Sequence, residues 1–289
     1  KITIINYLER KVLMDNKKTL YISDLDGTLL NSNAAISDYT AQMLNKFISD
    51  GGFFSVATAR TAATAISMVR CININVPVIL MNGVCIYDTQ NNVYVKIEKI
   101  SDEICSQMLD VIREFSLSGF LFSITDSVLD TYYENINSPN AAKFVEERTN
   151  KFGKVFTKVD NFKNCIGRGI IYYSVTDRYE LLEPLYLKLK KVKGIHIDFY
   201  RDVYDENYWY LEISSDKASK YNAVMYLRKE YKFDRIIGFG DNFNDIPMFD
   251  ACDEAYAVEN GKDEVKKKSD GVIFSNNNDG VVKKIYSLY

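Results

Sequence analysis

Residues 19–28 read TLYISDLDGT, a mostly apolar run that leads into two aspartates one residue apart. A short run of this kind predicts a buried β-strand over 19–23, with Asp24 as the first residue beyond its end. Ligands of open α/β sheets bind at the carboxyl ends of the strands. Because Gly27 allows a tight turn, the carboxylates of Asp24 and Asp26 can converge on one small volume. The stretch therefore predicts the first strand of an α/β sheet and a candidate reactive site at its end.

Strands and helices alternate on both sides of an intervening segment. Ser37 is expected to cap a helix that Gly51 ends, and a further helix is expected to start near Thr61. After residue 211 the same alternation returns, with a helix from about Lys217. Expected strands cover residues 19–23, 53–57, 76–81, 235–240, 254–258 and 271–274. This order is typical of a parallel sheet with crossover helices.

The intervening segment has a different character. It is rich in Tyr, Phe, Asn and Lys, and residues 170–175 and 195–200 alternate in the manner of one-sided strands. Apolar-periodic stretches near 103–115 and 178–190 predict helices. Most of its aromatic side chains are expected to pack its own core, and stacking on a ligand is the less favoured alternative.

These observations predict an α/β fold in which a Rossmann-like parallel-sheet core is interrupted by an inserted α+β cap domain. The core is assigned to residues 19–86 and 211–289, and the cap to residues 87–210. Residues 1–18 are assigned to an N-terminal extension outside the fold. Within it, residues 1–13 are expected to be an added segment or a misassigned start, because the first methionine is Met14.

A second acidic motif, GDNFND, occupies residues 240–245 directly after an expected strand. An acidic turn or a helix N-terminus would account for either motif alone. If both strands end at the same sheet edge, however, Asp24, Asp26 and Asp241 crowd one site. Two like charges 4 Å apart repel by about 4 kcal/mol at an effective dielectric constant of 20, so such a cluster needs a cation or shifted pKa values. Oxygen ligands without Cys or His favour Mg²⁺.

Composition argues against several other classes of protein. Lys and Arg total 36 against 39 for Asp and Glu, a balance that gives no electrostatic case for nucleic acid as a partner. The five cysteines are odd in number and contain no CxxC pair, which disfavours a disulfide framework or a zinc site and favours a reducing cytoplasm. No apolar run approaches the ~20 residues that span a bilayer. The single histidine, His196, lies in an alternating segment and is expected to be structural rather than a general base.

The DLDGT motif at 24–28 and the GDNFND motif resemble those of the haloacid dehalogenase superfamily. The resemblance implies that Asp24 attacks phosphorus and forms an aspartyl-phosphate, while Asp26 acts first as acid and then as base. It implies that Asp241 is a metal ligand, that Asn244 contacts the phosphate and that Asp245 supports the metal shell. Site assignments for Mg²⁺ are therefore Asp24, Asp26, Asp241 and Asp245.

The same resemblance extends to phosphate-binding groups. Thr58 stands where the family places a hydroxyl, followed by the backbone N–H of Ala59, although glycine is common at that position in close relatives. Arg60 is left open between a substrate contact and a structural ion pair. After the sequence LEI, Lys220 matches the lysine of the Cof-type subfamily, with Lys217 as its competitor.

Further matches to this subfamily are the Asn-Gly pair at 82–83 and the C-terminal pattern at 258–261. The sequence is thus expected to be a Mg²⁺-dependent phosphatase of small phosphorylated metabolites, sugar phosphates first, with pyridoxal and flavin phosphates as further candidates. The cap is expected to select the substrate. Alternatives are a sugar phosphomutase on the same core and a non-catalytic sensor of phosphorylated ligands. The sequence does not indicate an oligomeric state.

Overall fold

The computed structural model describes residues 17–202 and 205–289, so the predicted extension lies outside the described residues except for its last two. The chain forms two compact units. The first comprises the chain up to Thr58, residues 68–78 and residues 224–289, and the second comprises residues 59–67 and 79–223. Among the residues described, no helix has the length and apolar character needed to cross a bilayer.

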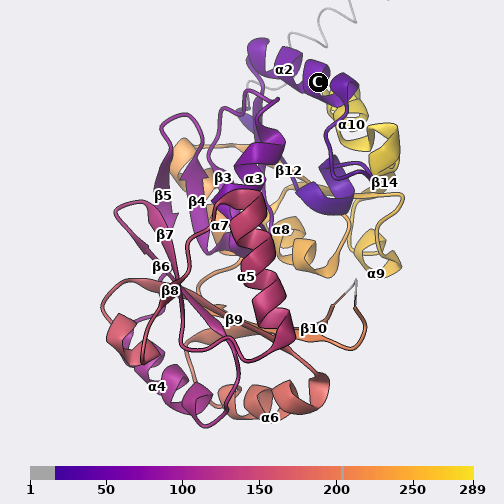
Figure 1. The fold of residues 1–289 in the computed structure, drawn as a ribbon. Helices are drawn as coiled ribbons and strands as arrows, with labels where there is room; N and C mark the ends of the chain where they lie inside the picture. Colours follow the sequence, from indigo (N-terminus) through magenta and orange to yellow (C-terminus); the bar gives the residue numbers. More distant parts are fainter. Residues whose placement is uncertain (1–16, 203–204) are drawn as a thin grey trace, which may run out of the picture. The chain divides into compact units, whose positions relative to one another are not determined.

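A five-stranded parallel sheet forms the centre of the first unit (Figure 1). Its strand order is β14-β13-β12-β1-β2, so β1 lies between β2 and β12, and Leu20 and Ile22 on β1 are fully buried. The strands are β1 (Thr19–Ser23), β2 (Phe53–Val56), β12 (Arg235–Gly240), β13 (Glu254–Val258) and β14 (Gly271–Ile273). The prediction of a parallel α/β core is therefore confirmed.

Helix α2 (Asp38–Ser49) and helix α10 (Gly280–Leu288) pack together in this unit. The Ser37 side chain accepts a hydrogen bond from the Thr40 N–H at 3.0 Å, which is the predicted N-cap, and Gly51 follows the helix with a φ of 98°. The Phe47 ring makes edge contacts with Tyr21 on β1 and with the C-terminal Tyr289. Helices α8 (Ile246–Ala251) and α9 (Asp263–Lys266) belong to the same unit, whereas α3 (Ala62–Val69) and α7 (Lys220–Tyr231) are each divided between the two units.

The strand expected at 76–81 is shorter and lies elsewhere. β3 (Val78–Leu80) belongs to a separate three-stranded sheet with β4 (Cys85–Asp88) and β5 (Val93–Ile97). Beside β2, the Phe54 N–H donates to the Asn75 side chain at 3.1 Å, and the Ser55 hydroxyl donates to the Pro77 carbonyl at 2.8 Å. Because Pro77 has no backbone N–H, it cannot donate a hydrogen bond to a neighbouring strand. Hydrogen bonds that involve side chains therefore replace the strand pairing that was expected beside β2.

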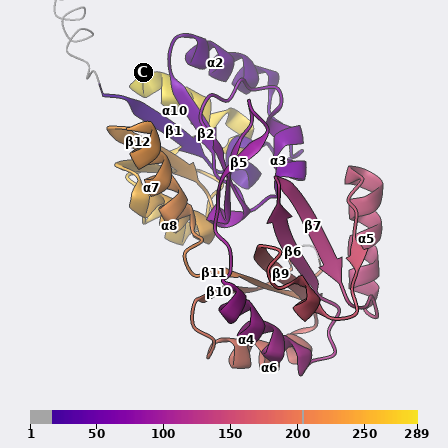
Figure 2. The same ribbon diagram turned by 90° about the vertical axis from the view of Figure 1, so that its left-hand side faces the viewer.

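The second unit contains a six-stranded sheet of order β10-β11-β9-β6-β7-β8, antiparallel except for the β7–β8 pair. Helices α4 (Asp102–Arg113) and α6 (Tyr179–Leu189) pack on one face, and α5 (Pro139–Phe152) lies on the other (Figure 2). The strands are β6 (Phe120–Thr125), β7 (Val128–Tyr133), β8 (Thr157–Lys158), β9 (Ile170–Asp177), β10 (Ile195–Arg201) and β11 (Trp209–Ser215).

Strand β11 bears on the domain boundaries. It pairs with β10 along its whole length and with β9 over residues 209–214. Residues 211–215, which were expected to belong to the core, therefore lie in the antiparallel sheet. These residues read LEISS, an alternating pattern that suits either kind of sheet. The functional division into a core at 19–86 and 211–289 and a cap at 87–210 stays a prediction.

Candidate active site

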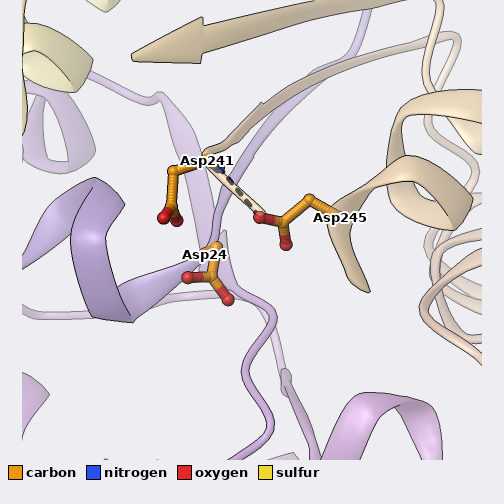
Figure 3. A group of neighbouring side chains, drawn as sticks. All are labelled: Asp24, Asp241 and Asp245. Atoms are coloured by element: carbon orange, nitrogen blue, oxygen red, sulfur yellow. Dashed lines mark hydrogen bonds between the residues drawn. The ribbon is translucent and has the colours of Figure 1, made fainter. Parts of the chain in front are cut away.

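Two neighbouring strands of the parallel sheet each end in an aspartate. Asp24 follows β1 and Asp241 follows β12, and because the two strands are parallel their carboxyl ends lie at the same edge. The Asp24 N–H donates to the Phe239 carbonyl at 2.9 Å, which extends the ladder to the point where Asp24 leaves it. Carboxylate oxygens of Asp24, Asp241 and Asp245 all lie within 4.8 Å of one another (Figure 3). Two stretches separated by more than two hundred residues thus form one acidic site.

Asp245 is fully buried and is fixed by backbone groups. Its Oδ2 accepts hydrogen bonds from the N–H groups of Asp241 at 2.9 Å and Asn242 at 3.0 Å. Asn242 in turn takes part in a capping box around the short turn Phe243–Asp245. These backbone donors therefore fix the position of the Asp245 carboxylate beside Asp241.

The turn after β1 orients Asp241. The Thr28 hydroxyl donates to Asp241 Oδ1 at 2.7 Å, so the side chain of the first motif holds the carboxylate of the second. Gly27 has a φ of 80°, and a Cβ built at this position would lie 2.6 Å from Asp241 Oδ2. Glycine is therefore required here both for its backbone conformation and for the space that it leaves. Gly240 has a similar role, because a Cβ there would lie 2.6 Å from the Asp245 Cβ.

A third loop, after β13, also holds the site together. The Asn260 side chain donates from Nδ2 to the Gly27 carbonyl at 2.7 Å and accepts the Asn276 N–H at 3.0 Å. The Lys262 N–H donates to the Asp241 carbonyl at 2.9 Å. The pattern at residues 258–261 did not by itself predict this positioning role. The available signal was their place directly after an expected strand of the same sheet.

The remaining predicted residues are placed as follows. Thr58 is buried just beyond β2, where the Ala57 N–H donates to the Ser23 carbonyl at 2.9 Å and aligns this strand end with that of β1. Asp26 is exposed, and its side chain is not one of the three clustered carboxylates. Asn244 is partly buried within the turn after β12.

Ala59 and Lys220 belong to the second compact unit. Lys220 is 1% exposed at the first position of α7, whereas most lysines keep their ammonium group in water. Burial of this kind is expected of a functional lysine. The phosphate-binding roles of Thr58, Ala59, Lys220 and Asn244, and the metal and catalytic roles of the aspartates, stay predictions.

The electrostatics of the three carboxylates favour a bound cation. Their proximity is unfavourable unless a positive charge lies among them, and every candidate ligand atom is a carboxylate oxygen. Thr28 and two backbone N–H groups hold the carboxylates of Asp241 and Asp245 in place. The donor set therefore fits a divalent cation that prefers oxygen.

Comparisons with known proteins show which family the chain resembles along nearly its whole length. A sequence profile described as haloacid dehalogenase-like hydrolase matches residues 21–285. The 5-amino-6-(5-phospho-D-ribitylamino)uracil phosphatase of Bacillus subtilis is 22% identical over 293 residues, covering 95% of this chain and 100% of that protein. The pyridoxal phosphate phosphatase of Escherichia coli is 22% identical over 275 residues, covering 91% of this chain and 96% of that protein.

The fold also matches solved structures. The crystal structure of a Thermotoga maritima protein aligns with a TM-score of 0.75 and 24% sequence identity, covering 93% of this chain and 96% of that protein. This likeness shows the fold, with its parallel-sheet unit and its second, largely antiparallel unit.

Proposed function

Because this chain belongs to the haloacid dehalogenase-like hydrolase family, we propose that it is a Mg²⁺-dependent phosphatase of small phosphorylated metabolites that works through an aspartyl-phosphate on Asp24. One observation carries the proposal: carboxylates that follow β1 and β12 meet within 4.8 Å at one sheet edge. Phosphoryl transfer needs little covalent machinery beyond a nucleophile, but it needs strong charge stabilisation and accurate positioning.

The first step uses Asp24 and Asp26. An Asp24 carboxylate oxygen forms a bond to phosphorus as the bond from phosphorus to the ester oxygen breaks, and Asp26 gives a proton to the leaving oxygen. Asp24 suits this role because it is buried and its backbone is fixed by the ladder to β12. Asp26 suits its role because its exposed carboxyl is accessible to the leaving group and to water.

The second step returns the protein to its starting state. Asp26, now ionised, accepts a proton from a water molecule as the water oxygen bonds to phosphorus and the bond to Asp24 breaks. Inorganic phosphate and the free Asp24 carboxylate result. A bound Mg²⁺ supplies charge neutralisation between the phosphate oxygens and the nucleophile. Asp24, Asp241 and Asp245 would hold it, with Thr28 and Asn260 fixing the loops on which the first two lie.

The predicted phosphate contacts complete the proposal. Thr58, the N–H of Ala59, Asn244 and Lys220 would donate to the phosphate oxygens. Two relatives are phosphatases of a phosphoribityl compound and of pyridoxal phosphate, which supports small organic phosphate monoesters as the substrate class. Sugar phosphates remain the first candidates, with pyridoxal phosphate next.

A metabolite screen tests this function. Wild-type protein should release inorganic phosphate from p-nitrophenyl phosphate and from some members of a panel of phosphorylated metabolites when Mg²⁺ is present, and should stop when Mg²⁺ is chelated. Asp24→Asn should abolish release, whereas Asp250→Asn, a change of an exposed aspartate on α8, should leave it unaltered. Equal release by wild type and Asp24→Asn would remove the nucleophile assignment. Formation of a sugar-phosphate isomer without free phosphate would indicate a phosphomutase instead.

A further inference from the structure

The turn between β3 and β4, in the second compact unit, has an unusual backbone. Met81 and Asn82 have left-handed φ angles of 51° and 53°, and Gly83 follows with a φ of 100°. Residues with a side chain rarely adopt this conformation, and they keep it only where the surrounding structure holds them in it. The Met81 N–H donates to the Arg60 carbonyl at 3.1 Å, and the Met81 carbonyl accepts the Val84 N–H at 3.1 Å. Backbone hydrogen bonds thus fix the turn on both sides.

The backbone of Gly83 lies directly against the backbone of Ser219. A Cβ built on Gly83 would lie 2.9 Å from the Ser219 backbone N and closer still to its carbonyl group. This is nearer than the Cβ of a folded protein comes to another atom. Because the obstructing atoms belong to the main chain, no side-chain rotation could make room. Any residue other than glycine would therefore displace Ser219 or the turn itself.

Ser219 begins helix α7, and Lys220 is the first residue of that helix. The Ser219 Oγ accepts the Asn222 N–H at 3.0 Å, and its carbonyl accepts the Ala223 N–H at 3.0 Å, so Ser219 is the N-cap. The preceding segment is also held, because the Asn222 side chain donates to the Lys217 carbonyl at 2.9 Å. The position of Ser219 therefore determines where the side chain of Lys220 starts.

Lys220 lies where a lysine is costly. Its side chain is 1% exposed, and charged side chains are seldom fully buried. The helix dipole also opposes a cation at the start of a helix, because its positive end lies there. We infer that Gly83 is a positioning residue for Lys220, which it holds in place through the backbone of Ser219. The effect on catalysis rests on the proposed function, in which Lys220 binds the phosphate, whereas the placement itself does not.

Amine labelling measures this placement without catalysis. Wild type and Gly83→Ala are treated briefly with acetic anhydride, and mass spectrometry of the peptides gives the labelled fraction of each lysine. Lys220 should be protected in wild type and labelled several-fold more in Gly83→Ala. Lys217, which is exposed, is the internal reference and should be labelled equally in both proteins. Equal protection of Lys220 in the two proteins would overturn the inference.

Gly167→Ala is the matched control. Gly167 belongs to the same unit and also has a left-handed φ, of 88°, but a Cβ there would meet no atom within 4 Å. The substitution therefore strains the backbone without creating a clash. It should leave the protection of Lys220 and the activity as in wild type. If it exposed Lys220 as much as Gly83→Ala does, backbone strain alone would explain the effect and the inference would fail.

A double-mutant cycle measures the effect on hydrolysis of p-nitrophenyl phosphate. Gly83→Ala should lower kcat/KM by about a hundredfold, the cost expected when a binding group shifts by about 1 Å. Lys220→Met should change kcat and KM in the same proportions as Gly83→Ala. The double variant should be about as active as Lys220→Met alone, because residues that act through one another are not additive. Losses that multiply in the double variant would indicate a general structural role and contradict the inference.

The Ser219 cap supplies a second test if Gly83→Ala does not fold. Ser219→Ala removes the acceptor of the Asn222 N–H, whereas Ser219→Asp keeps one. Lys220 should be labelled more in Ser219→Ala and stay protected in Ser219→Asp, and equal protection in both would overturn the inference. Absence of any hydrolysis by wild type would count against the proposed function alone, because labelling would still decide the placement of Lys220.

Discussion

Replacing Asp241 by asparagine removes one of three negative charges that lie within 4.8 Å of one another. At that distance two unit charges repel by about 3.5 kcal/mol at an effective dielectric constant of 20, and Asp241 faces two such neighbours. Asp241 is only partly buried, so solvent reduces this repulsion considerably. An asparagine oxygen can still accept the hydrogen bond from Thr28, which keeps the local geometry. The net gain in unfolding free energy without metal should be about 1–2 kcal/mol.

The assay is thermal melting with a chelator and then with Mg²⁺. In chelator, Asp241→Asn should melt higher than wild type by roughly 2–8 °C. With added Mg²⁺ the order should reverse, because wild type gains stability by binding the ion and the variant does so poorly. Asp250→Asn controls for the loss of one negative charge and should behave as wild type. A variant that melts lower than wild type in chelator and gains equally from Mg²⁺ would refute the reasoning.

Three further results are expected. Gly27→Ala should lower kcat/KM by about a hundredfold or more, since its Cβ would meet Asp241 at 2.6 Å and a misplacement of this size is costly in an active site; normal activity would contradict it. Asn260→Ala should lower kcat/KM by roughly tenfold while costing only ~1 kcal/mol in chemical denaturation, because it releases the Gly27 carbonyl. Above a pH of about 8, wild type should gain unfolding free energy relative to Lys154→Met, because partial burial lowers the pKa of Lys154 to about 8 in the folded chain and the unfolded chain therefore holds more protons. Denaturant titrations from pH 7 to 10 measure this difference, and parallel pH profiles would contradict it.

The acidic site could be predicted because its determinants are local. An apolar run, a turn glycine and two carboxylates mark the end of β1, and a comparable signal marks the end of β12. Parallel strands place their carboxyl ends at one edge, so the meeting of Asp24 and Asp241 followed from topology alone. The contacts made by Asn260 did not follow, because they depend on how a third loop packs against the first.

Other features of the fold could not be predicted because contacts between residues distant in sequence decide them. Residues 211–215 alternate in a way that suits either sheet, and only pairing with β9 and β10 decides their place. The position of β3 depends on Asn75 and Pro77. The Asn75 side chain and the Pro77 carbonyl accept hydrogen bonds from residues of β2, so this edge of β2 does not pair with β3. The position of the Lys154 ammonium group over the Phe122 ring had no sequence signal, because it arises from the end of α5 and the packing of aromatic rings.

Chemical trapping of the phosphorylated residue tests the central claim most directly. Asp26→Asn should slow hydrolysis of the intermediate, so protein mixed with substrate and Mg²⁺ and then treated with borohydride should contain a reduced acyl phosphate. Peptide mapping by mass spectrometry should locate the reduction at Asp24 and nowhere else. Hydrolysis by wild type with no modification at Asp24 in the trapped variant, or modification at another carboxylate, would contradict the account.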